Sequence, residues 1–139
     1  MFKHILVPTD LTDRNRKAME IAVKMALEDS AQITLLHVVE TIDDANTEDF
    51  RKFYKQLGSR AARRMNEIIE EWRQEELIID KQVLFGRRVH EILNFADANG
   101  IDLIILSSHR LEMGNASQGW GTISFKVGVL SHCPVMLVK

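Results

Sequence analysis

The sequence contains little cysteine, no long apolar run and almost no excess of charge of either sign. Its single cysteine, Cys133, excludes an internal disulfide and agrees with a reducing compartment. No stretch approaches the ~20 consecutive apolar residues of a membrane-spanning helix, and the apolar run near the start, residues 5–7, is too short for the core of a signal peptide. We therefore expect a cytoplasmic protein without a membrane partner.

The balance of charges also limits the classes of partner. The 18 Lys and Arg residues and 20 Asp and Glu residues leave a formal charge of −2, which provides no overall attraction to nucleic acid. A chain of 139 residues is long enough to bury roughly two-thirds of its unfolded surface in one core. Neither an internal repeat nor a low-complexity tract is visible, so we expect one domain over residues 1–139.

Catalytic and metal-binding motifs are absent as well. The sequence has neither the Gly-x-Ser-x-Gly elbow of a hydrolase nor the Gly-x4-Gly-Lys-Ser/Thr loop of a nucleotide triphosphatase. Its histidines lack metal-ligand spacing, and His4 and His37 fit better as strand residues with satisfied hydrogen bonds. A nucleophile triad can be assembled from Ser107, Ser108, His37 and His109 near Asp10, but five histidines in 139 residues produce such combinations by chance. We expect a protein that is not an enzyme, although the sequence leaves slow ATP hydrolysis open.

What the chain does contain is a regular alternation of apolar blocks and amphipathic segments. Five apolar blocks without helical period predict strands buried on both faces, at residues 3–7, 32–39, 81–85, 103–106 and 134–139. Helical spacing predicts helices that begin after Thr12 or Asp13, run from Thr47 to about Leu77, end at Asn99-Gly100, and begin again at Ile123. This order predicts an α/β fold, a single doubly wound five-stranded parallel sheet with helices on both faces.

Polar residues follow the first and the fourth of these strands. Pro8, Thr9 and Asp10 follow the first, while Ser107 and Ser108 open a loop that leads to the helix start at Gly121-Thr122. Such sheets bind ligands beyond the carboxyl ends of their strands, and a helix N-terminus attracts anions. We expect a binding crevice here. Asp10 has two open roles: it hydrogen-bonds a base or sugar, or it caps the first helix or turn.

Several stretches resemble the universal stress protein family along almost the whole chain. They are Lys-His-Ile-Leu-Val-Pro-Thr-Asp at 3–10, Leu-Leu-His-Val at 35–38, Gly86, Asp-Leu-Ile-Ile at 102–105, Gly121-Thr122 followed by Val127, and Cys-Pro-Val at 133–135. The resemblance implies an adenine-nucleotide alpha-hydrolase-like sheet of strand order 3-2-1-4-5, a homodimer joined through residues 135–138 and, in one subgroup, a bound adenine nucleotide. It further implies that Asp10 and the Val38 backbone hold adenine, and that Gly121, Thr122, Ile123 and Ser124 hold phosphates and ribose.

The glycine pattern of the nucleotide-binding subgroup is incomplete in this chain. That pattern is Gly-x2-Gly-x9-Gly-Ser/Thr, whereas Ser107 and Arg110 occupy the first two glycine positions and ten residues separate Arg110 from Gly121. A β-carbon at those positions hinders close approach of backbone to phosphate, although the Arg110 guanidinium can hold a phosphate itself. ATP or AMP is therefore expected to bind weakly or not at all. Two functions stay open: a dimeric nucleotide sensor, or a nucleotide-independent module that binds an unidentified protein and fills its own 108–121 loop.

Overall fold

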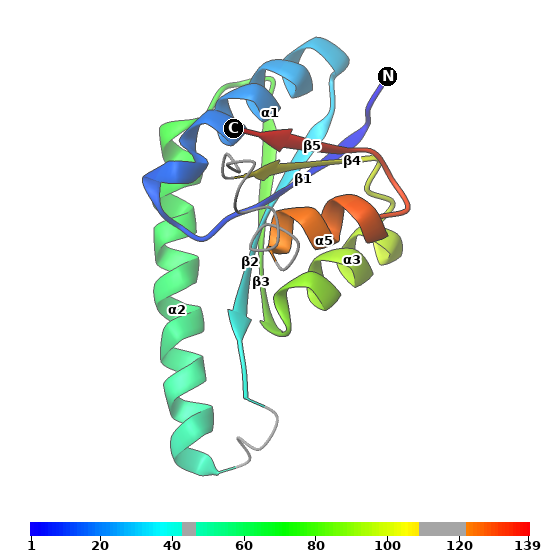
Figure 1. The fold of residues 1–139 in the computed structure, drawn as a ribbon. Coiled ribbons are helices and arrows are strands. Elements are labelled where there is room, and N and C mark those ends of the chain that lie inside the picture. Colours follow the sequence, from blue (N-terminus) through cyan, green and yellow to red (C-terminus); the bar gives the residue numbers. More distant parts are fainter. Residues whose placement is uncertain (43–46, 109–121) are drawn as a thin grey trace.

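A five-stranded parallel sheet forms the centre of the computed structural model, which describes residues 1–42, 47–108 and 122–139 (Figure 1). The strands lie in the order β3-β2-β1-β4-β5, and every neighbouring pair is parallel. This arrangement confirms the doubly wound sheet and the strand order that the family resemblance implied. The strands are β1 (His4–Pro8), β2 (Gln32–Glu40), β3 (Ile78–Gly86), β4 (Leu103–Ser107) and β5 (Val135–Val138).

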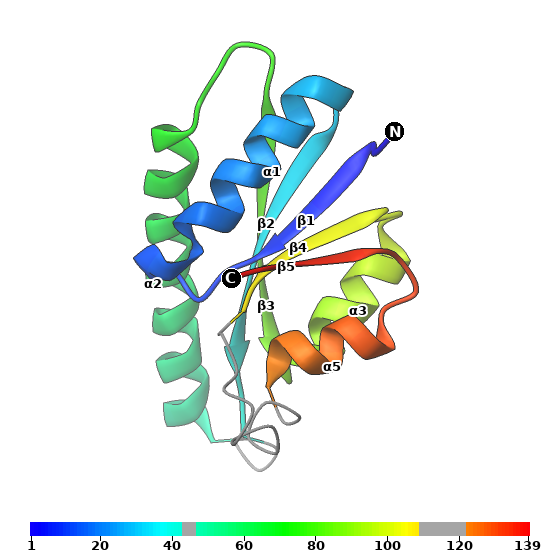
Figure 2. The ribbon, with the colours of Figure 1, turned by 45° about the horizontal axis from the view of Figure 1, so that its top comes forward.

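Helices cover both faces of the sheet. Helices α1 (Arg16–Asp29) and α2 (Glu48–Glu71) lie on one face, and α3 (Arg88–Ala98) and α5 (Ile123–Leu130) lie on the other (Figures 1 and 2). Successive side chains of a strand point to opposite faces, so Ile5 and Val7 of β1 join the core beneath α1 and α2, while Leu6 joins the second core. In the described part of the chain, no helix has the length and apolar character needed to cross a membrane.

The first helix does not begin as the sequence predicts. A 3-10 turn, η1 (Asp13–Asn15), precedes α1, and the side chain of Thr12 makes no capping hydrogen bond to it. The Thr12 hydroxyl instead donates to the carboxylate of Asp10. Thr12 therefore marks the start of the turn, but the prediction that Thr12 or Asp13 caps the helix was wrong because Asp10 engages Thr12.

The boundary between α2 and β3 also differs from the prediction. α2 ends at Glu71 and not near Leu77, and β3 begins three residues before Lys81, because Ile78 to Asp80 pair with Gln32 to Thr34 of β2. Pairing with β2 thus explains the early start of β3, whereas residues 72–77 form neither helix nor strand and contain a turn in which the Leu77 amide donates to the Gln74 carbonyl at 3.2 Å. The other end of α2 follows the sequence, since the Thr47 side chain accepts a hydrogen bond from the Phe50 amide at 3.4 Å.

Candidate functional site

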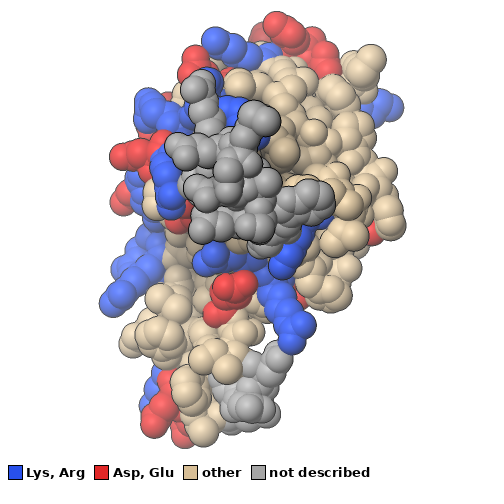
Figure 3. All heavy atoms as spheres, in the orientation of Figure 1, with Lys and Arg blue, Asp and Glu red and all other residues tan. Residues whose placement is uncertain are grey.

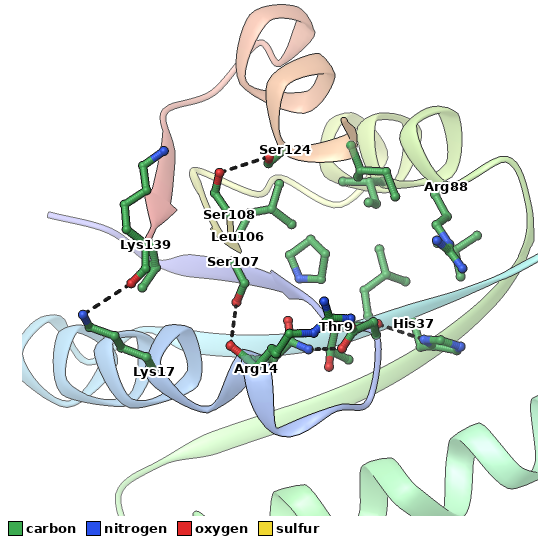
Figure 4. A pocket seen from close by; sticks show the side chains of 18 residues that line it. Thr9, Arg14, Lys17, His37, Arg88, Leu106, Ser107, Ser108, Ser124 and Lys139 are labelled. Carbon is green, nitrogen blue, oxygen red and sulfur yellow. Dashed lines mark hydrogen bonds and ion pairs between the residues drawn. The ribbon is translucent and has the colours of Figure 1, made fainter. Parts of the chain in front are cut away.

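A cavity of about 460 Å³ opens at the carboxyl ends of β1 and β4, where the strand order reverses (Figure 4). The chain leaves β1 toward α1 on one face of the sheet, whereas α5, which follows β4 along the chain, lies on the other face. The divergence of these connections leaves a crevice at the sheet edge. Its volume lies within the range of small-molecule sites, about 300–1,000 Å³. The sequence places its candidate crevice at the same strand ends.

One wall of the crevice is apolar. Leu36 and Val38 alternate along β2 and so point to the same face, where Leu106 of β4 lies in the same core cluster. Ile92 of α3 and Ile123 of α5 complete this wall. All of these side chains are aliphatic, so the wall favours a flat apolar group over a charged one.

Hydroxyl groups gather beside Leu106 and Ile123, where the chain leaves β4 and where α5 begins. Ser124 Oγ lies 3.2 Å from Ser108 Oγ and 3.3 Å from Thr122 Oγ1, so three hydroxyls from two segments form one cluster. Thr122 is the N-cap of α5 and accepts a hydrogen bond from the Phe125 amide at 3.2 Å. Hydroxyls beside a helix N-terminus provide the donors that a phosphate or sugar requires.

Cations outnumber carboxylates among the described lining residues. Positive charge comes from the side chains of Arg14, Lys17, Arg88 and Lys139, and Asp10 is the acidic side chain among the described lining residues. Lys17 Nζ donates to the backbone oxygen of Lys139 at 3.4 Å (Figure 4). Arg88 Nε lies 3.9 Å from the carboxylate of Glu40, which does not line the crevice. This excess of positive charge favours an anionic ligand.

The carboxylate of Asp10 is engaged by its own loop. It accepts hydrogen bonds from the Thr12 amide at 2.9 Å, from the Thr12 hydroxyl and from the Asn15 side chain, and Arg14 lies 3.1 Å away. Burial acts to raise the pKa of Asp10, but the hydrogen bonds from Thr12 and Asn15 and the charge of Arg14 together hold that pKa below its ordinary value. Asp10 therefore lines the crevice and organises the turn that leads into α1.

The histidines of the strands are hydrogen-bonded as predicted. His37 Nδ1 donates to the carbonyl oxygen of Thr9 at 2.8 Å, and His4 Nε2 lies 2.7 Å from Thr34 Oγ1. Ser107 Oγ donates to the Arg14 carbonyl at 3.4 Å, so it is engaged away from the imidazole of His37. Within the described ranges, no group of three or more His, Cys, Asp or Glu side chains is arranged to hold a metal ion.

The crevice brings together eight of the residues that the sequence singled out, and Thr122 lies beside it as the cap of α5. Arg110 and Gly121 lie outside the described residues. The eight are Pro8, Thr9, Asp10, Val38, Ser107, Ser108, Ile123 and Ser124.

Sequence reasoning missed the cations and most of the apolar wall. Leu36 had a signal, because it lies two residues before Val38 and a strand's side chains repeat with period two. Arg14 and Arg88 had none, since only the tertiary fold brings the starts of two helices to the same edge of the sheet.

Comparison with known proteins decides the family. The model of the universal stress protein family matches residues 1–139. This chain belongs to that family. Universal stress protein YxiE of Bacillus subtilis is 30% identical over 153 residues that cover all of both chains. Among solved structures, UspA of Lactobacillus plantarum superposes with a TM-score of 0.82 at 22% identity, covering 99% of this chain and 98% of that one. Hypothetical protein MJ0577 superposes with a TM-score of 0.85 at 25% identity, covering 100% and 96%.

Two more distant members of this fold were solved with a nucleotide. A universal stress protein in complex with cAMP superposes with a TM-score of 0.68 at 18% identity, covering 99% of this chain and 96% of that one. The universal stress protein of Archaeoglobus fulgidus in complex with dAMP has a TM-score of 0.65 at 16% identity, covering 99% and 98%. At these identities the similarity shows that the fold is shared.

Proposed function

We propose that this universal stress protein is a cytoplasmic, dimeric module of the stress response that senses an adenine nucleotide in the crevice between β1 and β4 and does not act as a catalyst. The observation that carries the proposal is the composition of that crevice. One cavity of about 460 Å³ combines an aliphatic wall, suited to a base, with a hydroxyl cluster at the start of α5, suited to a phosphate. The cAMP and dAMP complexes of two relatives support the same class of ligand.

The nucleotide is expected to bind weakly. Ser107 occupies a position at which the nucleotide-binding subgroup has a glycine, and that glycine allows the backbone to approach a phosphate closely. The Ser107 hydroxyl donates to the Arg14 carbonyl on the far side of the crevice (Figure 4). Charged side chains, Arg88 among them, offer long-range attraction in place of close backbone contacts. Tight ATP that stays bound through purification contradicts this expectation.

Calorimetric titration with AMP and with ATP, each with and without Mg²⁺, tests the proposal. We expect saturable binding that weakens about fivefold in Ser124→Ala, because a neutral hydrogen bond contributes ~1 kcal/mol. Arg60→Ala is the matched control, since Arg60 is exposed on α2 beneath the opposite face of the sheet. If neither nucleotide produces a heat of binding, and thermal unfolding shows that the chain is cooperatively folded, the proposal of a nucleotide sensor is rejected.

The second candidate function is a protein-interaction module that does not use a nucleotide. One observation favours it: the Asp10 carboxylate, to which the family resemblance assigns the adenine, already accepts hydrogen bonds from Thr12 and Asn15 and pairs with Arg14. An adenine amino group would have to compete with these donors. Under this proposal the loop 108–121 is filled by its own side chains, and all of that loop after Ser108 lies outside the described residues.

Dimerisation through β5 is the remaining part of the proposal. β5 forms the edge of the sheet beside β4, and Leu137 at its centre is 36% exposed. An apolar edge strand tends to recruit another strand, and two copies related by a two-fold axis present the same surface to each other. Such an assembly closes at two copies.

A further inference from the structure

A second hollow, of about 810 Å³, lies between the residues that follow β2 and the helices α3 and α5. We call it the basic groove. Four of its lining residues are aliphatic: Ile42 is 64% exposed, Leu130 is 56% exposed, and Val89 and Leu93 of α3 are half-buried. Partly exposed aliphatic side chains that line one concave surface are typical of a binding surface.

The rim of the basic groove is positively charged. Arg87, Arg88 and Lys126 line the groove together with the carboxylate of Glu40, whose oxygen is 3.9 Å from Arg88 Nε, and Arg87 also has an interaction within the chain. No carboxylate of the described residues pairs with the Lys126 ammonium. Figure 3 shows Lys and Arg atoms beside Asp or Glu atoms near the passage from β3 to α3. The chain as a whole carries a charge of −2, so this rim is a local reversal of sign.

The position of the two arginines is unfavourable for the helix itself. Arg87 is the N-cap of α3 and makes no side-chain capping hydrogen bond, and Arg88 is the first helical residue. The positive end of the helix dipole disfavours cations there, and Glu91 offsets this only in part. The helix dipole of α3 therefore does not stabilise the two positive charges at its start.

We propose that the basic groove binds an acidic amphipathic peptide segment of a partner protein. The carboxylates of the segment meet the cations of the rim, and its aliphatic side chains cover Ile42 and Leu130. Charge complementarity of this kind steers association and sets specificity, and apolar anchors in the middle of the contact contribute affinity. The groove shares Arg88 and Ile123 with the crevice but needs no nucleotide.

The composition of the groove argues against two other anionic occupants. Single-stranded nucleic acids bind where aromatic side chains stack on their bases, and the described lining of the groove contains no Phe, Tyr or Trp. Its one aromatic ring among the described residues is the imidazole of His90, which lies within hydrogen-bond distance of the Asn94 side chain, 3.0 Å away. A small anion such as polyphosphate would use the rim and leave Ile42 and Leu130 in water. The joint presence of cations and aliphatic side chains selects a ligand that carries both acidic and apolar groups.

The test is fluorescence anisotropy with a labelled 12-residue peptide of Glu and Leu, with Leu at helical i, i+3 and i+4 spacing, measured without nucleotide. We expect saturable binding that weakens about tenfold in Lys126→Glu and several-fold in Ile42→Ser. Arg60→Glu is the matched control, because it reverses the same charge on α2 and forms an i,i+4 pair with Arg64. Its affinity is expected to equal that of the unmodified chain. Lys126→Gln, which removes the charge without reversing it, is expected to show an intermediate loss.

Each comparison has an outcome that overturns the proposal. Equal binding of a peptide with Ser in place of Leu, or of polyphosphate or a single-stranded oligonucleotide, shows that only anions are recognised. An equal loss of peptide affinity in Arg60→Glu shows that the peptide is held by non-specific electrostatic attraction. No saturable binding by the unmodified chain ends the proposal directly. Thermal unfolding and light scattering of each variant separate a lost contact from a lost fold or a changed oligomer.

Discussion

Asp10 shows how a single side chain connects the stability of this protein with its crevice. Its carboxylate is hydrogen-bonded to Thr12 and Asn15 and paired with Arg14, and these partners come from the turn that leads into α1. Burial opposes the ionised form, yet the partners outweigh it and lower the pKa of Asp10. Ionised Asp10 therefore stabilises the folded chain at neutral pH.

Asp10→Asn tests this at the scale of the residue. We expect a loss of about 1 kcal/mol at pH 7, less than a buried charged hydrogen bond because Asp10 is largely exposed. The folded pKa lies below the unfolded value of about 3.9, so the stabilisation is present above about pH 4 and disappears as the pH falls through the folded pKa. Urea unfolding of both proteins at pH 7, 5 and 3 measures it. A difference that persists unchanged at pH 3 contradicts the electrostatic account.

The same carboxylate also distinguishes the two proposed functions. If adenine displaces the donors of the turn and binds Asp10, Asp10→Ala abolishes AMP binding while the thermal midpoint falls by only a few degrees. Calorimetry with AMP, together with a melting curve, checks both quantities. A variant that melts far lower, with its residual AMP affinity unchanged, shows that Asp10 acts in the turn alone.

At the scale of the element, α2 contains a glycine that helix propensity alone disfavours. Gly58 is buried in the middle of the helix, and a β-carbon there would lie 2.7 Å from Cζ of Phe85 on β3. The glycine lets the ring of Phe85 reach the helix backbone. The local cost of ~1 kcal/mol relative to alanine is thus offset by contact between two elements.

A double-mutant cycle measures how far the contact between Gly58 and Phe85 offsets the low helix propensity of glycine. In the unmodified chain, Gly58→Ala is expected to change the free energy of unfolding by less than about 0.5 kcal/mol, because the gain in helix propensity is offset by displacement of the Phe85 ring, which is 46% exposed and free to move outward. In a Phe85→Leu background the same substitution is expected to stabilise by about 1 kcal/mol. Urea unfolding measures the free energy of unfolding of the unmodified chain, the two single variants and the double variant. Equal effects in both backgrounds rule out the coupling.

At the scale of the whole molecule, the edge strand β5 determines the assembly that we propose. Leu137→Glu places a charge in the proposed interface, and Val135→Pro removes a backbone donor from the edge. Both variants are expected to be monomeric at tens of micromolar, where the unmodified chain is a dimer, as measured by light scattering. Arg60→Ala serves as the control with an unchanged mass. A monomeric unmodified chain contradicts the dimer, and dimers in both variants place the interface elsewhere.

Much of the fold was predictable because burial imposes a local pattern. β1 and β4 are short apolar blocks followed by polar residues, and a block buried on both faces has few alternatives to a parallel sheet. The stop at Gly100 was readable for a similar reason, since its φ of 64° suits glycine. The boundary near Ile78 was not readable, because pairing with β2 decides it.

By itself, the sequence determined the α/β class, the number of strands and the two polar strand ends that line the crevice. The tertiary structure alone decided what those ends do: it directed Thr12 and Asn15 to Asp10, and it brought Arg88 to the crevice. It also assembled the basic groove from Ile42, Val89 and Lys126, which lie far apart in the chain. The physical reason is the distance along the chain over which each kind of interaction acts. Apolar periodicity acts within one element, whereas a binding surface depends on side chains that meet only after the sheet has set the positions of its helices.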